Sequence, residues 1–272
     1  MVDEPPANPA LAEKIRSDRP HPARVWNALL GGKDNYAADR EAADEIAKAD
    51  PTIRRYAQQC REFLVRSVRY LAGEAGIRQF LDIGTGLPTE LNTHEVAQSV
   101  APESRVVYVD NDPLVLIHAR ALLTNTTPEG VTTYVDADVR DPETIIADAQ
   151  NVLNFNEPIA VMLLGIFGHA APEYATMRSI LDRLMAAVPS GSYLVLLDGA
   201  RTDDEVYIAA VARAAEVGHP YHLRTPEQLA ECFAELEMVE PGMVPVNRWR
   251  PDPSDAGRDK PCNAYGGMGR KP

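Results

Sequence analysis

The sequence predicts an α/β fold in which helices cover a doubly wound, mainly parallel sheet. Short runs rich in apolar and β-branched residues alternate with segments of helical spacing, the pattern of strand–helix–strand units. The runs at residues 159–164 and 193–197 are apolar almost throughout, as expected of strands buried on both faces. A turn with two glycines, residues 84–86, connects the first run to a helical segment and suggests a nucleotide-like ligand there.

The expected elements follow from the positions of apolar residues, prolines and glycines. Strands are expected at residues 79–83, 105–110, 131–135, 159–164 and 193–197, and two more, 238–246 and 263–267, as an antiparallel pair. Helices are expected at residues 39–48, 53–71, 92–100, 113–123, 172–187 and 203–217. One side of the helix 53–71 carries five arginines, which we interpret as a solvated basic face.

Composition excludes several classes of protein. The net charge of −13 argues against a bulk electrostatic grip on nucleic acid. The three cysteines, Cys60, Cys232 and Cys262, lack the spacing of a metal site, and we expect no bound metal. No apolar run approaches the roughly 20 residues of a membrane helix, and the acidic, proline-rich start does not resemble a signal peptide. We therefore expect a cytoplasmic protein that binds neither membrane nor nucleic acid.

The glycine turn also indicates which ligand binds. Gly84 and Gly86 allow a sharp turn with Thr85 between them, but Thr89 stands where a dinucleotide fingerprint needs a third glycine. Asp82 just before the turn would repel a pyrophosphate and attract a cation. S-adenosylmethionine carries an ammonium and a sulfonium and fits this pattern. The alternative is an ordinary strand-to-helix turn.

Two further strand ends carry candidate ligands for an adenosine. Asp110 ends the second strand, where a carboxylate can accept both ribose hydroxyls, and Asn111 follows it. After the third strand, Asp138 is a candidate acceptor for the exocyclic amine of adenine, and the backbone N–H of Val139 for a ring nitrogen. Exposed acidic loops are the alternative at both places.

The chain before the first strand divides into two parts. Residues 1–20 are expected to be loosely ordered, and residues 21–76 to form a helical extension that works as a lid. Around Gly31 and Gly32, the lid would bring its polar groups to the cofactor carboxylate and its aromatic rings over the ligand. Its candidate contact residues are Trp26, Lys33, Asn35 and Tyr36. A capped helix end with packed aromatic residues is the alternative.

His169 follows the fourth strand, where a methyl acceptor would meet the cofactor. An acceptor that must lose a proton benefits from a base, and His169 is the first candidate for this role. Tyr36 is a second candidate catalytic residue. A hydrogen-bonded structural histidine and a packed tyrosine are the alternatives.

The residues from about His21 onward resemble a bacterial S-adenosyl methyltransferase family, within the class I S-adenosylmethionine-dependent methyltransferases. The resemblance rests on these motifs: WNALLGGKDNYAADR, LDIGTGLPT, NTHEVAQ, VVYVDNDP, ADVRDP and GSYLVLLDG. It implies a Rossmann-like domain over residues 77–272, with a seven-stranded sheet whose last strand is antiparallel. By position, Asp82, Gly84 and Gly86 match the glycine-rich motif, Asp110 the ribose-binding acid, and Asp138 with Val139 the adenine side. Pro88 departs from the wider superfamily, which often has a third glycine there.

Three functions remain open from the sequence. The first is a methyltransferase acting on a small molecule. The second is a non-catalytic protein that binds S-adenosylmethionine or S-adenosylhomocysteine, because no residue is unambiguously a base. The third is an NAD-dependent oxidoreductase, which Asp82 and the missing third glycine disfavour. The resemblance supplies neither the acceptor nor the oligomeric state.

Overall fold

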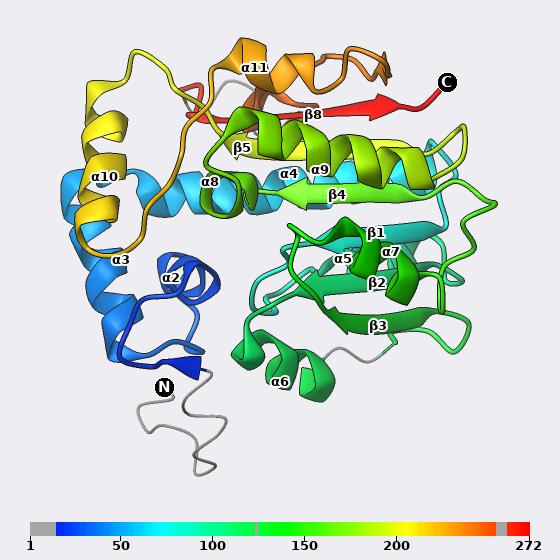
Figure 1. The fold of residues 1–272 in the computed structure, drawn as a ribbon, viewed down its shortest axis with the longest axis horizontal. Helices are drawn as coiled ribbons and strands as arrows, with labels where there is room; N and C mark the ends of the chain where they lie inside the picture. Colours follow the sequence, from blue (N-terminus) through cyan, green and yellow to red (C-terminus); the bar gives the residue numbers. More distant parts are fainter. Residues whose placement is uncertain (1–14, 123–124, 254–259) are drawn as a thin grey trace.

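The structure, a computed structural model, describes residues 15–122, 125–253 and 260–272. A single sheet forms its centre, with the strand order β3-β2-β1-β4-β5-β8-β6 (Figure 1). The first five strands are parallel, and β8 runs antiparallel to β5. The strands are β1 Gln79–Ile83, β2 Arg105–Asp110, β3 Val131–Asp136, β4 Ala160–Leu164, β5 Tyr193–Gly199, β6 Glu237–Met238, β7 Val244–Pro245 and β8 Ala264–Arg270. The predicted doubly wound, mainly parallel fold is confirmed.

The last strands differ from the prediction. One continuous strand over residues 238–246 was expected, and this is wrong. The chain instead forms β6 and β7, which pair with β8 at its two ends, at Gly269–Arg270 and at Tyr265–Gly266. Pro241 and Gly242 lie between them, and a proline has no N–H to donate to a neighbouring strand. The two short strands together occupy the seventh position in the sheet.

Helices cover both faces of the sheet. In Figure 1, α4 lies behind the strands and α7 and α9 lie in front. Side chains alternate along each strand, so that Phe80 packs into one buried cluster and Leu81 into the other. The helices are α2 Pro22–Leu29, α3 Ala37–Ala49, α4 Ile53–Gly73, α5 Thr93–Val100, α6 Pro113–Leu122, α7 Pro142–Ala149, α8 Phe167–Ala170, α9 Tyr174–Ala187, α10 Glu205–Glu216, α11 Pro226–Glu231 and a 3₁₀ helix, Val246–Arg248.

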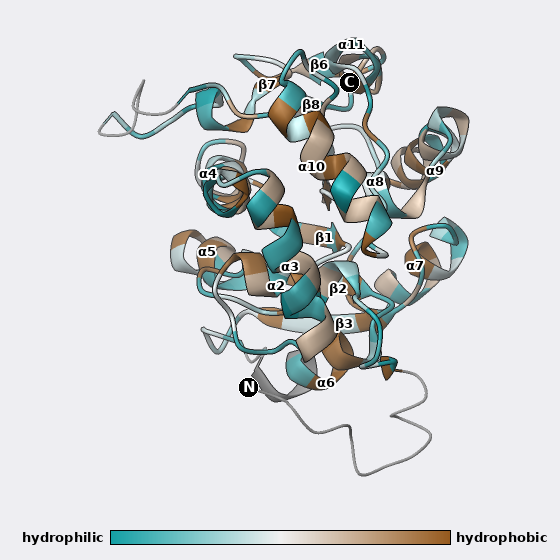
Figure 2. Ribbon diagram, turned by 90° about the vertical axis from the view of Figure 1, so that its left-hand side faces the viewer, coloured by the Kyte–Doolittle hydropathy of each residue, from teal (hydrophilic) through white to brown (hydrophobic). Residues whose placement is uncertain are grey.

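Three helices stand beyond the carboxyl ends of the parallel strands. These are α2, α3 and α10, and Figure 2 shows them in front of the strands. α3 packs against both α2 and α10. Buried residues of α2 and α3 belong to the same apolar cluster as α4 and one face of the sheet. The N-terminal helices and the sheet therefore share one core. Of the segment expected to be loosely ordered, residues 1–14 lie outside the described residues, and Ile15 is buried.

Two arginines of α4 make hydrogen bonds to other parts of the chain, which a solvated face would not require. Arg66 donates to the backbone carbonyls of Trp249 and Val246, at 3.0 and 2.7 Å. Arg61 donates to the carbonyl of Glu90 and to Asn92. The prediction of a freely solvated basic face is therefore wrong for these two residues, because loops close over this side of α4. Within the described ranges, no helix is long and apolar enough to cross a membrane.

Candidate functional site

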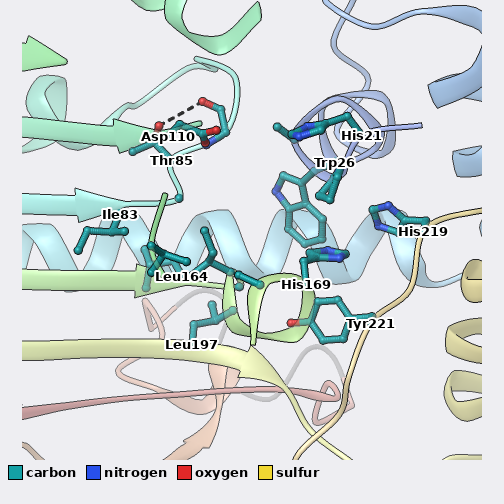
Figure 3. Close-up of a pocket in the computed structure, with 18 of the residues that line it drawn as sticks. His21, Trp26, Ile83, Thr85, Asp110, Leu164, His169, Leu197, His219 and Tyr221 are labelled. Carbon is teal, nitrogen blue, oxygen red and sulfur yellow. Dashed lines mark hydrogen bonds between the residues drawn. The ribbon is translucent and has the colours of Figure 1, made fainter. Parts of the chain in front are cut away.

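A cavity of about 340 Å³ opens at the carboxyl ends of β1, β2, β4 and β5 (Figure 3). Turns that follow the strands form one part of its wall, which we call the strand half. The strand half consists of Ile83, Gly84, Thr85, Gly86, Val109, Asp110, Asn111, Ala137, Asp138, Val139, Arg140, Leu164, Gly165 and Ile166. The N-terminal helices and α10 form the opposite part, the helix half. The helix half consists of Pro22, Ala23, Trp26, Leu29, Ile46, Ile53, Tyr56, Tyr207, Ala210, Val211 and Ala214. The imidazole of His21, the N-cap residue of α2, also lines the cavity beside the helix half.

The glycine turn requires its glycines. Gly84 and Gly86 have φ angles of 76° and 64°, in the left-handed region that other residues avoid. The N–H of Gly84 donates to the carbonyl of Val109 at 2.8 Å, which ties the turn to β2. A Cβ atom on Gly84 would lie 2.2 Å from Cδ1 of Ile166. The turn therefore has no room for a side chain at Gly84, and its surface faces the cavity.

Asp110 is held firmly at the wall of the strand half. Its Oδ2 accepts from the N–H of Gly86 at 2.8 Å, and its Oδ1 accepts from the N–H of Asp112 at 3.0 Å. Burial raises the pKa of this carboxyl group. A carboxylate oxygen can accept more than one hydrogen bond, so both oxygens retain capacity for hydroxyl donors. The arrangement offers a fixed pair of acceptors that suits a vicinal diol.

The turn after β3 forms the next part of the strand half. Asn111 donates to Oδ2 of Asp138 at 3.1 Å, and Nε of Arg140 donates to Oδ1 at 2.9 Å. The hydrogen bond from Arg140 lowers the pKa of Asp138. Val139 is buried in the wall beside them. The predicted residues Gly84, Thr85, Gly86, Asp110, Asn111, Asp138 and Val139 are thus brought together in one wall.

Asp82 lies apart from this wall. It is buried behind the glycine turn, where the hydroxyl of Thr93 donates to its Oδ2 at 2.7 Å. Together with Arg61 it borders a small hollow on that side of the turn. Burial raises the pKa of Asp82 to about 6. Its charge therefore acts on the cavity from behind Thr85 and Gly86.

The helix half is apolar and contains three aromatic rings. Trp26 meets Tyr56 edge to face, with ring centroids 6.1 Å apart. Tyr56 stacks on Tyr207 at 5.8 Å. α2, α4 and α10 supply one ring each, so this surface is assembled from distant parts of the chain. It suits a flat apolar molecule.

A group of three side chains, the histidine group, lies where the two halves meet. It consists of His169 on α8 and of His219 and Tyr221 on the loop between α10 and α11 (Figure 3). The His169 ring lies 4.5 Å from that of His219 and 4.7 Å from that of Tyr221. Burial lowers the pKa of His169 to about 4 and that of His219 to about 3, so both rings are neutral at pH 7. Sequence reasoning missed His219 and Tyr221, although two histidines and a tyrosine within residues 219–222 were a visible signal.

The segment around Gly31 and Gly32 contributes less to the cavity than expected. Trp26 lines the cavity, but Lys33, Asn35 and Tyr36 do not. Asn35 donates to Oδ1 of Asn27 at 2.8 Å and to the carbonyl of Gly32, which closes the loop on itself. Tyr36 is buried at the start of α3, with the guanidinium of Arg24 over its ring. Lys33 is exposed.

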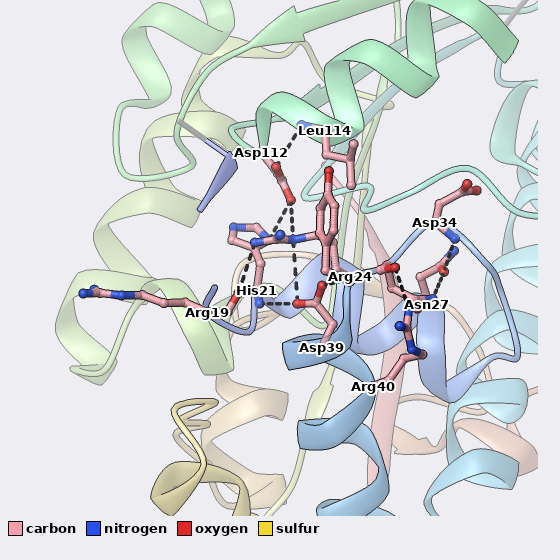
Figure 4. A network of polar contacts seen from close by, with 11 residues as sticks. Arg19, His21, Arg24, Asn27, Asp34, Asp39, Arg40, Asp112 and Leu114 are labelled. Carbon is pink, nitrogen blue, oxygen red and sulfur yellow. Dashed lines mark hydrogen bonds and ion pairs between the residues drawn. The ribbon is translucent and has the colours of Figure 1, made fainter. Parts of the chain in front are cut away.

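A buried polar network joins this segment to the strand half (Figure 4). Nε of Arg24 lies 3.8 Å from Oδ1 of Asp39 and 3.5 Å from Oδ2 of Asp112. Nδ1 of His21 lies 3.0 Å from the same Asp112 oxygen. Asp112 also donates its backbone N–H to Asp110. The network therefore connects α2 and α3 to the carboxylate in the cavity wall.

Known proteins resemble this chain in sequence and fold. The model of a family described as S-adenosyl methyltransferase matches residues 8–272. A DUF574 family protein from Streptomyces avermitilis is 42% identical, with a TM-score of 0.90 over 95% of this chain and 100% of its own. A structure from Thermobifida fusca, whose description proposes a methyltransferase, is 43% identical, with a TM-score of 0.87 over 97% of each chain.

A more distant structure shares the fold alone. Human N-acetylserotonin methyltransferase in complex with SAM is 12% identical, with a TM-score of 0.50 over 96% of this chain and 65% of its own. A comparison with the curated proteins finds no match. In the part of the chain that the structure describes, no group of three or more histidine, cysteine or acidic residues is placed to hold a metal ion. From the family match over nearly its whole length, the chain belongs to the S-adenosyl methyltransferase family.

Proposed function

We propose that this protein is an S-adenosylmethionine-dependent methyltransferase that acts on a small molecule. The observation that carries the proposal is the carboxylate of Asp110, which two backbone N–H groups fix beside a glycine turn that has no room for a side chain at Gly84. Such a carboxylate at the end of the second strand suits the ribose hydroxyls of an adenosine. The apolar helix half then leaves space for an acceptor beside the cofactor.

The residues of the strand half fit the chemical groups of this cofactor. Asp110 would accept from the ribose hydroxyls, and Asn111, Asp138 and Val139 would border the adenine. Gly84, Thr85 and Gly86 would let the backbone approach the rest of the molecule. Asp82 behind the turn favours a cation there, by charge attraction. When bound, S-adenosylmethionine supplies a methyl group that its sulfonium has activated for displacement.

What the protein adds to such a reaction is alignment. Methyl transfer needs the nucleophile in line with the methyl group and the sulfur, and holding that geometry lowers the barrier. The strand half would hold the cofactor, and the helix half would hold the acceptor. The apolar wall formed by α2, α3 and α10 would limit the access of water to the place where cofactor and acceptor meet.

Calorimetry with a matched pair of variants tests the proposal. We expect S-adenosylhomocysteine and S-adenosylmethionine to bind and NAD not to bind. Asp110→Asn is expected to weaken S-adenosylhomocysteine binding roughly 10- to 100-fold, the range for a lost hydrogen bond to a charged group. Asp136→Asn, at the exposed end of β3, is the control and is expected to stay within about twofold.

Each alternative has its own outcome. Equal affinities of Asp110→Asn and Asp136→Asn would remove Asp110 from the ribose site. Binding of NAD in preference to S-adenosylhomocysteine would favour an oxidoreductase. Tight binding of the cofactor without turnover of any compound in a metabolite extract would favour a non-catalytic binding protein.

A further inference from the structure

The distribution of charge in the cavity restricts what the helix half can bind. All the acidic and guanidinium side chains that line the cavity within the described residues, namely Asp110, Asp138 and Arg140, belong to the strand half. The helix half presents only apolar and aromatic side chains, and the imidazole of His21 beside it is already paired with Asp112. A charged acceptor placed there would lose its hydration without gaining a partner, which is costly in a buried site. The helix half therefore favours a molecule that is uncharged where it meets the helices.

A buried ion pair beside the histidine group does not change this conclusion. Asp198 at the end of β5 and Arg224 are both almost fully buried and lie 3.5 Å apart. Asp198 also accepts from the hydroxyl of Tyr221 and from the N–H of Gly199. Neither Asp198 nor Arg224 lines the cavity. Asp198 instead anchors the loop that carries His219 and Tyr221, through its hydrogen bond with Tyr221.

His169 is held in a single tautomer. Its Nδ1 lies 2.9 Å from the carbonyl oxygen of Pro220. A carbonyl only accepts hydrogen bonds, so Nδ1 carries the proton, and in the neutral ring Nε2 is left with a free lone pair. No hydrogen-bond partner of Nε2 is found within residues 15–122, 125–253 and 260–272. His169 thus offers a proton acceptor at the junction of the two halves.

The loop that supplies this carbonyl is tightly fixed. Tyr221 fits between two glycines: a Cβ atom would lie 2.1 Å from its ring at Gly168 and 2.9 Å from it at Gly199. The N–H of His222 donates to the carbonyl of Gly168 at 2.8 Å. Because Tyr221 and His222, the two residues after Pro220, are anchored, the fold fixes the carbonyl that orients the His169 ring.

We propose that the methyl acceptor is an uncharged aromatic hydroxyl compound, a phenol or naphthol, that lies against Trp26, Tyr56 and Tyr207 and donates its hydroxyl to Nε2 of His169. This inference rests on the proposed methyltransferase function and adds the class of acceptor to it. The three rings supply edges and faces for a flat partner. A protonated amine has no lone pair for the methyl group, and the helix half holds no carboxylate to bind it.

The proposed reaction conserves atoms and charge. The acceptor's O–H bond breaks while its oxygen forms a bond to the methyl carbon, and the carbon–sulfur bond of the cofactor breaks. The proton passes to Nε2 of His169, so that the positive charge of the sulfonium reappears on the imidazolium. The products are an aryl methyl ether and S-adenosylhomocysteine, and no oxidant, reductant or metal is needed.

The first test measures binding of three probes of similar shape. 2-Naphthol, 2-naphthoate and the 2-naphthylmethylammonium ion are titrated into the protein saturated with S-adenosylhomocysteine, with calorimetry as the readout. Naphthol is expected to bind at least about tenfold more tightly than either ion, from the cost of burying an unpaired charge. If either ion binds as tightly as naphthol, or if naphthol does not bind, the acceptor class is wrong. Failure of S-adenosylhomocysteine itself to bind would instead remove the proposed function.

The second test places a charge in the helix half. Ala210 lines the cavity on α10, while Ala212 on the same helix is exposed. Ala210→Asp is expected to weaken naphthol binding at least about tenfold, and Ala212→Asp to leave it unchanged. Val211→Asp, at a half-buried position of the same wall, replaces Ala210→Asp if that variant does not fold. Unchanged naphthol affinity in the folded cavity variant would overturn the placement.

The third test separates the role of His169 from binding. His169→Gln retains a group that can donate to the Pro220 carbonyl but lacks the basic nitrogen. Transfer of a labelled methyl group to naphthol is expected to fall roughly 10²- to 10⁴-fold, the usual contribution of a general base. The affinities for S-adenosylhomocysteine and naphthol are expected to stay within about threefold. Full methyl transfer by this variant would contradict the assignment of His169.

Discussion

The two halves of the cavity are built on different principles. In the strand half, the contacting residues lie at or just after the ends of strands, and hydrogen bonds from backbone N–H groups fix the carboxylates of Asp110 and Asp138. In the helix half, the rings of Trp26, Tyr56 and Tyr207 come from three helices that are far apart in the sequence. The strand half is thus formed by the ends of neighbouring strands, whereas the helix half is apolar and assembled by tertiary packing.

This difference separates what the topology of the sheet provides from what the packing of the helices provides. A parallel sheet places strand ends side by side whatever its helices do, so the strand half follows from the topology. The helix half depends on how α2, α3 and α10 pack, and α10 contacts α3 directly. The ion pairs of Arg24 with Asp39 and Asp112 connect the two halves, because they link α2 and α3 to the turn after β2. Perturbing these ion pairs should affect both halves.

The largest expected effect is therefore at Arg24. Arg24→Met would leave the carboxylates of Asp39 and Asp112 buried without their cation, which typically costs about 3–5 kcal/mol of unfolding free energy. Chemical denaturation measures this loss, with Arg69→Met, at an exposed position on α4, as the control. We also expect weaker S-adenosylhomocysteine and naphthol binding in the Arg24 variant. A loss below about 1 kcal/mol would mean that the two halves are joined by apolar packing alone.

A smaller effect is expected at Asp82 behind the glycine turn. Its pKa of about 6 exceeds the ordinary value of 3.8, so the folded protein holds this proton to higher pH than the unfolded chain. Unfolding free energy should consequently fall as pH rises from about 4 to about 6, by on the order of 2–3 kcal/mol, and this contribution stays level above that. Asp82→Asn keeps an acceptor for Thr93 and removes the ionisation.

The measurement compares the variant with the wild type at pH 4.5 and pH 7.5. Asp82→Asn should gain stability relative to the wild type at the higher pH, and its affinity for S-adenosylmethionine should fall because the negative charge behind the turn is lost. Equal stability differences at both pH values would show that Asp82 titrates normally in the folded protein. Asp136→Asn, at an exposed acid, controls for the change in net charge.

The strands at the centre of the sheet could be predicted because their sequences are apolar on both faces. The observed β1 and β2 have the expected bounds, and β3, β4 and β5 differ by one or two residues. β6 and β7 could not be predicted in this way. Each has only two residues, and pairing with β8 rather than local preference defines them. The four-residue helix α8 is similarly too short to show a helical period.

The same distinction explains the candidate site. Asp110 and the glycine turn were visible because a strand end can be located from sequence, and the fold then brings strand ends together. His219 and Tyr221 follow a helix and have no periodic pattern, and their position depends on Gly168 and Gly199 in other elements. A loop that tertiary contacts place cannot be located by local reasoning. The segment 31–36 posed the opposite problem, since its unusual composition is largely explained by contacts within the segment and with α2 and α3.

The smallest expected effect follows from this last point and concerns Lys33. The sequence placed its ammonium at the cofactor carboxylate, but the side chain is exposed and does not line the cavity. Asn35 holds the loop closed through Asn27 and Gly32, so bringing Lys33 inward would break these hydrogen bonds. We therefore expect Lys33→Ala to change S-adenosylhomocysteine affinity by less than about twofold, as is usual for exposed residues. A tenfold loss by calorimetry, with unchanged unfolding free energy, would instead show that residues 31–36 rearrange over the cofactor when it binds.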